Sequence, residues 1–322
     1  MQNQTSEAVV SVSKKLKKKK LAPVIPDKTI LKALRVPKLI KDKSKAFSFK
    51  QEEDLFGARL DREARLSSRD YKTVIPNRYV GIEIELNNAG LNKADKAEWK
   101  DLAGYCSAIK NDGSVDGDGV ELNTVPARGL AFHKQIEVVG ASLKALGAKA
   151  NKSCGLHVHV DASDYTGADA FKLALLWAKI EGLVFETLPV SRRTNTYCGK
   201  YSNSIIEKIK ASKHKLEHTT VDPVLRRFGL GSKYQGLNFG SYFRLKTFEF
   251  RCHEGTSDGT EMALWGMVCA EIVSFAKRNP ISAIRELALP DLTPIFKEHP
   301  ILLKYIKARI KKATSGAKKA FL

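Results

Sequence analysis

The chain has 322 residues, of which 43% are hydrophobic, and it carries a formal net charge of +20. This length and composition predict a globular protein with one large domain or two small ones. No run of about 18 apolar residues occurs, which excludes an obvious membrane span. The N-terminal lysines lead into Pro23 and Pro26 instead of a long apolar export segment, so we expect a cytoplasmic protein.

Five cysteines are present, and none of them forms a CxxC pair. An odd number without metal-ligand spacing argues against a disulfide framework and against a structural zinc cluster. We therefore expect reduced thiols.

The positive charge is concentrated at the two ends of the chain. Residues 1–50 hold fourteen Lys or Arg against three acids, and residues 297–322 hold eight against one. We expect a disordered basic arm over 1–50, a folded domain over 51–296, and a basic helix or tail over 297–322. The lysine-rich ends are either solvated or make nonspecific, salt-sensitive contacts with nucleic acid or another acidic surface. Neither end interleaves aromatic residues for base stacking.

In chain order, strand-like and helical patterns alternate irregularly. Asp54–Asp70 has helical spacing and ends before Pro76. Strands are predicted over Tyr79–Leu86, Val120–Val125, Gly155–Val160 and Ser241–Cys252. Helices are predicted over 132–146, 168–188 and 261–277, and residues 205–219 form a lysine-rich helical or irregular insertion. This irregular order favours an α+β arrangement over a doubly wound one.

Three of these strands place ionisable residues two apart, so that the side chains share one face of a sheet. They are Glu83 and Glu85, His157 and His159, and Glu249, Arg251 and His253. Apolar residues lie between them, so each strand would turn an apolar face to the core and a charged face to a common cavity. A sheet builds a metal and phosphate site in this way.

The residue types in these strands suit divalent ions and phosphate. Glu83 and Glu85 offer the hard oxygen ligands that Mg²⁺ and Mn²⁺ prefer, and Glu121 adds a third from a neighbouring strand. Arg251 can neutralise the oxygens of a transferring phosphoryl group. One histidine of the HxH pair could bind metal and the other a substrate. HxH also occurs in zinc hydrolases and cupins, but the long helices after residue 165 weigh against the cupin fold.

Five short motifs, in this order, resemble the glutamine synthetase-like carboxylate-amine ligases, and specifically the amidoligases related to glutamate-cysteine ligase. The motifs are VGIEIEL (80–86), NDGSVDGDGVELNTVP (111–126), SCGLHVHVD (153–161), RRTNTYC (192–198) and TFEFRCHEGT (247–256). The resemblance runs from about Arg78 to Thr256. It implies a curved antiparallel sheet with helices packed on its outer side, and two divalent ions between ATP and the substrate carboxylate.

Carried onto this sequence, the resemblance implies roles for individual residues. One ion, nearer the substrate, would be held by Glu85 and Glu121. The ion bridging the ATP phosphates would be held by Glu83, His157 and Glu249. The γ-phosphate charge would be stabilised by Arg251 and one of Arg192 or Arg193, with Asn195 in the same phosphate segment. Asp112 and His159 would face the substrates. The second strand has only one clear acid, so Asp116 and Asp118 are candidate substitutes for a missing ligand.

The implied reaction joins a carboxylate, from a small molecule or a peptide, to an amine. ATP would convert the carboxylate into an acyl phosphate, which the amine would attack, with Glu121, Asp112 or His159 as the base. The resemblance also implies that the protein could form a homo-oligomer, because glutamine synthetase relatives often complete a site across subunits. Two alternatives stay open: a metal-dependent hydrolase or phosphotransferase, and a non-catalytic, basic, nucleic-acid-associated protein on a ligase-like fold.

Overall fold

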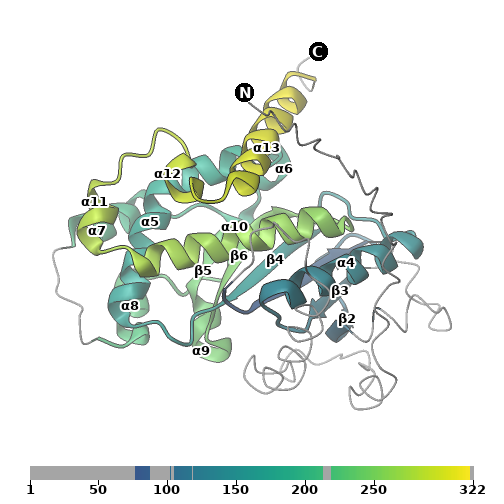
Figure 1. Ribbon diagram of the computed structural model, residues 1–322, viewed down its shortest axis with the longest axis horizontal. Helices are drawn as coiled ribbons and strands as arrows, with labels where there is room; N and C mark the ends of the chain where they lie inside the picture. Colours follow the sequence, from purple (N-terminus) through teal and green to yellow (C-terminus); the bar gives the residue numbers. More distant parts are fainter. Residues whose placement is uncertain (1–76, 88–101, 103–104, 118, 213–218, 320–322) are drawn as a thin grey trace, which may run out of the picture. The chain divides into compact units, whose positions relative to one another are not determined.

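The computed structural model describes residues 77–87, 102, 105–117, 119–212 and 219–319. The basic arm expected over 1–50 and the helix expected over 54–70 lie outside these residues. In the described part, antiparallel strands form one open six-stranded sheet in the order β2-β3-β1-β4-β6-β5. Helices pack on one face of this sheet (Figure 1). The predicted α+β class is confirmed.

All four predicted strands are present, but the last of them is shorter than predicted. Their bounds are β1 (Val80–Leu86), β2 (Cys106–Asn111), β3 (Val120–Thr124), β4 (Gly155–Asp161), β5 (Leu237–Asn238) and β6 (Thr247–Glu254). The prediction of one strand over Ser241–Cys252 is wrong in its first half, where the chain is helical. Lys246 ends this helical turn in a left-handed conformation, with φ of 56°, and the strand begins after it.

The helices lie mainly after β3. Their bounds are α4 (Gly129–Ala145), α5 (Gly167–Glu186), α6 (Val190–Arg193), α7 (Asn203–Ala211), α8 (Val221–Phe228), α9 (Tyr242–Leu245), α10 (Gly259–Arg278), α11 (Ile281–Glu286), α12 (Thr293–Phe296) and α13 (Pro300–Lys319), with the 3-10 turns η3 (Thr196–Cys198) and η4 (Phe239–Ser241). The three long predicted helices correspond to α4, α5 and α10. Gly147 follows α4 with φ of 69°, as expected for a glycine that stops a helix.

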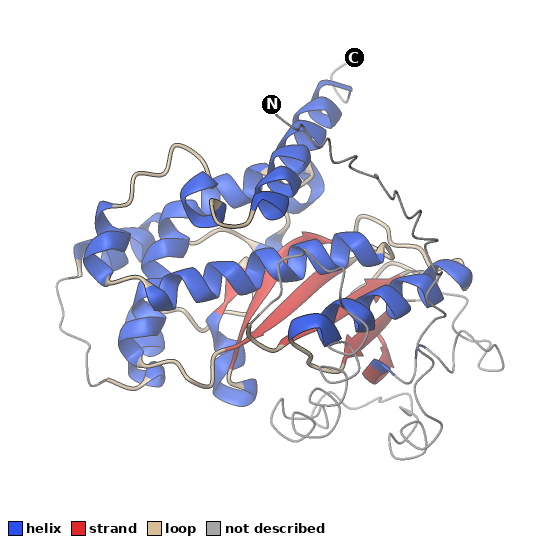
Figure 2. Cartoon of the chain, in the orientation of Figure 1, coloured by secondary structure: helices blue, strands red, loops and turns tan. Residues whose placement is uncertain are grey.

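The apolar face of the sheet forms the core with α4, α5 and α10 (Figure 2). Ile82, Val158 and Phe250 alternate with the charged residues of β1, β4 and β6, and all three are almost fully buried. The ring of Trp177 in α5 lies edge-on to Phe250, with 5.5 Å between the ring centroids. Burial of each such side chain stabilises the fold by about 1.5–3 kcal/mol. The charged side chains are consequently left on the opposite face of the sheet.

Helices α4 and α10 meet at a close glycine contact, which gives a testable prediction. A Cβ atom on Gly140 would lie 2.5 Å from the Cα and 2.6 Å from the nitrogen of Gly259. Because main-chain atoms cannot turn aside, Gly140→Ala is expected to lower the free energy of unfolding by about 1–3 kcal/mol. Urea denaturation measures this change.

Gly182→Ala is the matched control, since Gly182 is an exposed residue inside α5 where a Cβ would meet nothing within 4 Å. This variant should be more stable than the wild type by up to about 1 kcal/mol, because alanine favours the helix. A Gly140→Ala protein that matches the wild type in stability would contradict the close contact.

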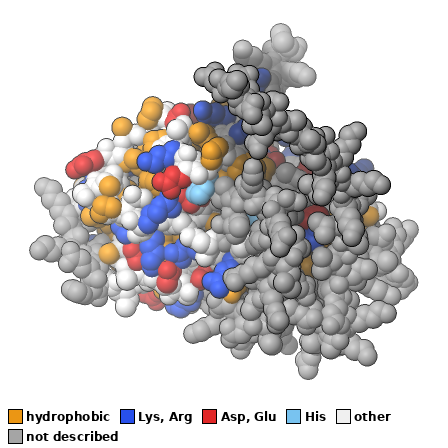
Figure 3. Space-filling model, in the orientation of Figure 1, with side chains coloured by type: hydrophobic (Ala, Val, Ile, Leu, Met, Phe, Trp, Pro, Cys, Tyr) orange, Lys and Arg blue, Asp and Glu red, His pale blue; other side chains and the backbone are white. Residues whose placement is uncertain are grey.

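Charged side chains of both signs lie on the described surface (Figure 3), and the cysteines lie in the interior. Acidic and basic side chains intermingle over the described surface seen in Figure 3. All five cysteines are buried and none forms a disulfide. Among the described helices, none combines the length and the apolar character needed to cross a bilayer.

Candidate active site on the open face of the sheet

Strand pairing brings most of the predicted site residues together. The cross-strand pairs are Glu83 with His157, Glu85 with Glu121, and His159 with Glu249. Opposite residues in antiparallel strands have side chains about 5 Å apart on the same face. The register therefore gathers acids and imidazoles from β1, β3, β4 and β6, although these strands are far apart in the sequence.

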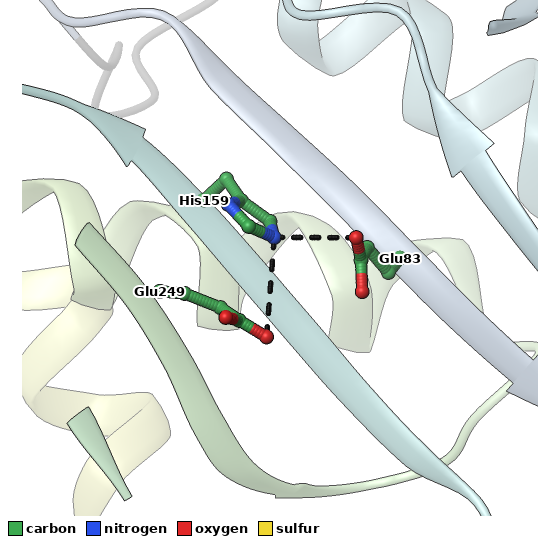
Figure 4. Close-up of side chains that lie close together, drawn as sticks. All are labelled: Glu83, His159 and Glu249. Atoms are coloured by element: carbon green, nitrogen blue, oxygen red, sulfur yellow. Dashed lines mark ion pairs between the residues drawn. The ribbon is translucent and has the colours of Figure 1, made fainter. Parts of the chain in front are cut away.

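Glu83, His159 and Glu249 form the first group of possible ligands (Figure 4). The Nε2 atom of His159 lies 3.3 Å from Glu83 Oε1 and 4.0 Å from Glu249 Oε1. Its other ring nitrogen, Nδ1, lies 2.9 Å from the hydroxyl of Thr247, which fixes the plane of the ring. Nε2 is buried and forms no well-aligned hydrogen bond to any described residue. A nitrogen held in this way between two carboxylates is suited to ligate a metal ion.

The electrostatics of this group follow from its neighbours. Burial opposes ionisation of Glu83, but His157 and His159 hold the pKa of its carboxyl well below the usual range. Burial likewise lowers the pKa of His159, but Glu249 and then Glu83 raise it above the ordinary value. The carboxylate of Glu83 is thus kept ionised, as a metal ligand must be.

His157 lies at the centre of the cluster. Its Nδ1 atom is 3.2 Å from Glu83 Oε2 and 3.7 Å from Glu249 Oε1, and its Nε2 atom is 3.5 Å from Glu85 Oε1. Gly155, two residues earlier, leaves room for this convergence. A Cβ atom at Gly155 would lie 2.9 Å from His157 Nε2 and 3.3 Å from Glu85 Oε2. Any larger residue here would press on both side chains.

Glu85, Asp112 and Glu121 form a second group, in which one oxygen from each lies within 4.8 Å of the others. The backbone N–H of Gly155 donates to Glu85 Oε2 at 2.6 Å. Lys110 lies beside Glu121, and its Nζ atom is 2.5 Å from Glu121 Oε1. Burial and then Glu83 raise the pKa of the Glu121 carboxyl, while Lys110 opposes this rise.

Both groups line one cavity of about 460 Å³. This volume falls in the range of sites that bind small molecules and cofactors. The cavity is lined by eight of the predicted site residues, namely Glu83, Glu85, Asp112, Glu121, His157, His159, Glu249 and Arg251. These side chains therefore surround a single volume on the open face of the sheet.

Arg251 projects from β6 into this cavity beside Glu249. Its guanidinium forms an ion pair with Glu249 Oε1, and Asn238 of β5 donates to the other oxygen, Oε2, at 2.6 Å. Although burial opposes it, Glu249 raises the pKa of Arg251. The Nε atom of Arg251 has no hydrogen-bond partner among the described residues. Glu249 therefore orients a permanent positive charge at the lining of the cavity.

The predicted phosphate segment, RRTNTYC, lies outside the cavity lining. Arg192 is buried, and it donates to the main-chain oxygens of Cys252 at 3.3 Å and Arg251 at 2.7 Å. Arg193 donates to the carbonyls of Leu188 and Glu186. Asn195 caps η3 by accepting from the N–H of Tyr197. In this structure Arg192 supports the backbone of β6, whereas Arg193 and Asn195 hold the segment between α5 and η3.

Asp116, one of the two candidate substitute ligands, does not join the cluster. Asp116 is exposed and does not line the cavity. Asp118 lies outside the described residues. Asp112 takes the third position beside Glu85 and Glu121 instead.

The expectation that His253 shares a face with Glu249 and Arg251 is wrong. The register between β4 and β6 shifts by one residue, because Leu156 pairs with His253 whereas Val158 pairs with Phe250. This β-bulge turns His253 to the helix side of the sheet. There its ring centroid lies 4.8 Å from that of Trp265 in α10. His253 is fully buried away from the cavity.

Sequence comparison supports the predicted resemblance over about half of the chain. Residues 118–273 match a family described as "Putative amidoligase enzyme". The resemblance to the amidoligases, a class of carboxylate-amine ligase, is thereby confirmed for this region. The matched region contains Glu121, both histidines of the HxH pair, Glu249 and Arg251. The sequence has no match among curated proteins.

Two solved structures are similar to this chain. One is a novel glutamine synthase homolog, with a TM-score of 0.38 and 14% identity, covering 81% of this chain and 70% of that chain. The other is a bifunctional glutathione synthetase from Pasteurella multocida, with a TM-score of 0.35 and 13% identity, covering 74% of this chain and 47% of that chain. The present chain thus spans about half the length of the glutathione synthetase.

Proposed function

We propose that this protein is an ATP-dependent carboxylate-amine ligase that forms an amide bond through an acyl phosphate. The observation that carries the proposal is the convergence of Glu83, His159, Glu249 and Arg251 on one cavity. The amidoligase match over residues 118–273 supports the same reaction class.

Glu83, His159 and Glu249 would hold a divalent ion, Mg²⁺ or Mn²⁺. Two carboxylates and one imidazole, with donor atoms within 4.8 Å of one another, suit such an ion. The buried Nε2 atom of His159 supports this assignment, because it faces both carboxylates. When bound, the ion would supply positive charge beside the phosphate oxygens of ATP.

Arg251 would stabilise the transfer of the γ-phosphoryl group to the substrate carboxylate. A carboxylate is a poor electrophile, because its oxyanion is a poor leaving group until it is phosphorylated. The planar guanidinium can donate parallel hydrogen bonds to phosphoryl oxygens, and Glu249 holds it in place before the substrate arrives. Because this charge is already in place, it lowers the activation barrier of phosphoryl transfer, and the protein does not have to rearrange during the reaction.

The amine then has to lose a proton before it attacks the acyl phosphate. Glu121 and Asp112 line the cavity and offer a carboxylate for this purpose, whereas both ring nitrogens of His159 are taken by the ion and by Thr247 in this assignment. The attack forms the carbon–nitrogen bond, breaks the carbon–oxygen bond to phosphate and releases inorganic phosphate. The cavity walls would limit the access of water to the acyl phosphate.

ADP release tests the proposal, with Mg²⁺, ATP and a mixed pool of carboxylates and amines. Wild-type protein should release ADP only when both a carboxylate and an amine are present. Glu83→Gln and Glu249→Gln keep the side-chain shape but remove ligand charge, and each should reduce release by about 10²-fold or more. Glu137→Gln is the control, since Glu137 is an exposed residue on α4 that pairs with Lys134.

The outcomes of this assay distinguish a ligase from the alternative functions. ADP release that needs no amine would support a metal-dependent hydrolase or phosphotransferase. Equal release from the wild type and from both charge-removing variants would count against any reaction at this cluster.

A further inference from the structure

Lys110 is a charged cavity residue to which neither the motifs nor the reaction above gives a role. It lies on β2, where strand pairing sets it directly opposite Glu121. The residue is only 8% exposed, and its ammonium Nζ atom is 2.5 Å from Glu121 Oε1. A lysine buried to this extent needs a carboxylate partner, and Glu121 is that partner.

The ammonium sits in the second carboxylate group, Glu85, Asp112 and Glu121. The other two acids of the group also have protein donors. Glu85 accepts from the N–H of Gly155, and Asp112 accepts from the N–H and the hydroxyl of Ser114, at 2.9 and 2.6 Å. The group contains no imidazole, in contrast to the group of Glu83, His159 and Glu249.

The position of Nζ conflicts with a divalent ion in the second group. An ion bound to Glu121 Oε1 at about 2.1 Å, the Mg²⁺–oxygen distance, would lie at most about 4.6 Å from Nζ. An ammonium has no lone pair with which to ligate the ion, so the two positive charges would only repel each other. In the first group Arg251 also pairs with Glu249 Oε1, but the Nε2 atom of His159 faces Glu83 and offers a lone pair to an ion between them.

We propose that the ammonium of Lys110 takes the place of a second divalent ion, so that the cavity holds one ion per chain, at Glu83, His159 and Glu249. This inference rests on the proposed function and departs from the two ions that the family resemblance implies. Lys110 offsets the charge of Glu121, one of the three acids in the second group, and supplies the positive charge that would face the substrate carboxylate.

Binding of Mn²⁺ to the full-length chain, measured by isothermal titration calorimetry without nucleotide, tests this inference. We expect one Mn²⁺ per wild-type chain. Glu249→Gln should lose this ion or bind it at least 10-fold more weakly, whereas Asp112→Asn should keep it with an unchanged affinity. Lys110→Met, which keeps an unbranched apolar stem without the charge, should bind a second Mn²⁺.

Circular dichroism establishes whether each variant folds. If Lys110→Met does not fold, the comparison of Glu249→Gln with Asp112→Asn tests the inference without it. Two ions per wild-type chain, or a single ion that Asp112→Asn loses and Glu249→Gln keeps, would overturn the inference. A folded Lys110→Met with only one ion would overturn it as well. Two wild-type ions together with amine-dependent ADP release would leave the proposed function standing. Absence of Mn²⁺ binding would remove both the inference and the metal site of the proposed function.

Discussion

Replacement of Arg251 by methionine is expected to lower kcat for amine-dependent ADP release by about 10³-fold. The guanidinium lies beside Glu249 in the cavity, where it would meet the negative charge that spreads over the phosphoryl oxygens in the transition state. Methionine preserves most of the volume but removes every donor. Arg251→Lys keeps the charge without the planar fork, so its kcat should fall between those of the wild type and of Arg251→Met.

Two further measurements make this prediction specific. Mn²⁺ titration of Arg251→Met separates lost phosphoryl stabilisation from a disturbed Glu249, because Arg251 also pairs with that carboxylate. Arg278→Met is the matched control, since Arg278 pairs with Glu271 at the end of α10 and does not line the cavity. An Arg251→Met protein with normal kcat and only a raised KM for ATP would show that Arg251 binds the ground state and the transition state equally, and so does not promote the transfer step.

Replacement of Arg309 by methionine is expected to lower the free energy of unfolding by about 3 kcal/mol. Arg309, on α13, is 6% exposed, and its guanidinium bridges Glu254 at the end of β6 and Glu261 in the first turn of α10. Its Nε atom also donates to the carbonyl of Thr187 at 3.1 Å. Without this cation, two partly buried carboxylates would lie close together with the imidazole of His253 as the remaining basic group beside both.

The pH dependence of this effect follows from Glu261. Burial opposes ionisation, but His253 and Arg309 lower the pKa of the Glu261 carboxyl from 4.5 to about 2. Because the pKa is lower in the folded state, the stabilisation is fully present above about pH 4.5 and is lost as the pH falls toward about 2. The difference in stability between wild type and Arg309→Met should therefore shrink over this window.

Urea denaturation at a series of pH values measures both parts of the prediction. Lys304→Met is the control, because Lys304 is an exposed residue on the same helix. A difference between wild type and Arg309→Met that stays constant from pH 7 to pH 2 would mean that the loss comes from packing and not from the ion pairs.

Much of the fold could be predicted because its signals are local. The alternation in β1 and β4 and the helical spacing in α4, α5 and α10 each depend on a single segment. The helical turn before β6 was missed because a lysine ends it, where glycine is the usual signal. Strand β2 was missed although Ala108, Lys110 and Asp112 stand two apart, since the strand is short and its flanks show no pattern.

The site was predictable as far as it depends on residues two apart within one strand. That rule placed Glu83, Glu85, His157, His159, Glu249 and Arg251 on a common face. Lys110 could not be assigned without β2, and Asn238 could not be linked to Glu249 without the pairing of β5 with β6. His253 was misplaced because a bulge is a property of two paired strands and leaves no sign in either one alone.

The bulge in β6 absorbs one residue without changing which side of the sheet the following residues face. Beyond it, Leu156 pairs with His253 and Gly155 pairs with Glu254, so removal of one residue between Phe250 and His253 would restore a regular ladder and leave these pairs in place. The same removal elsewhere in β6 would instead exchange the two sides of the sheet for part of the strand. Divergence of this chain in the length of β6 is therefore expected at the bulge.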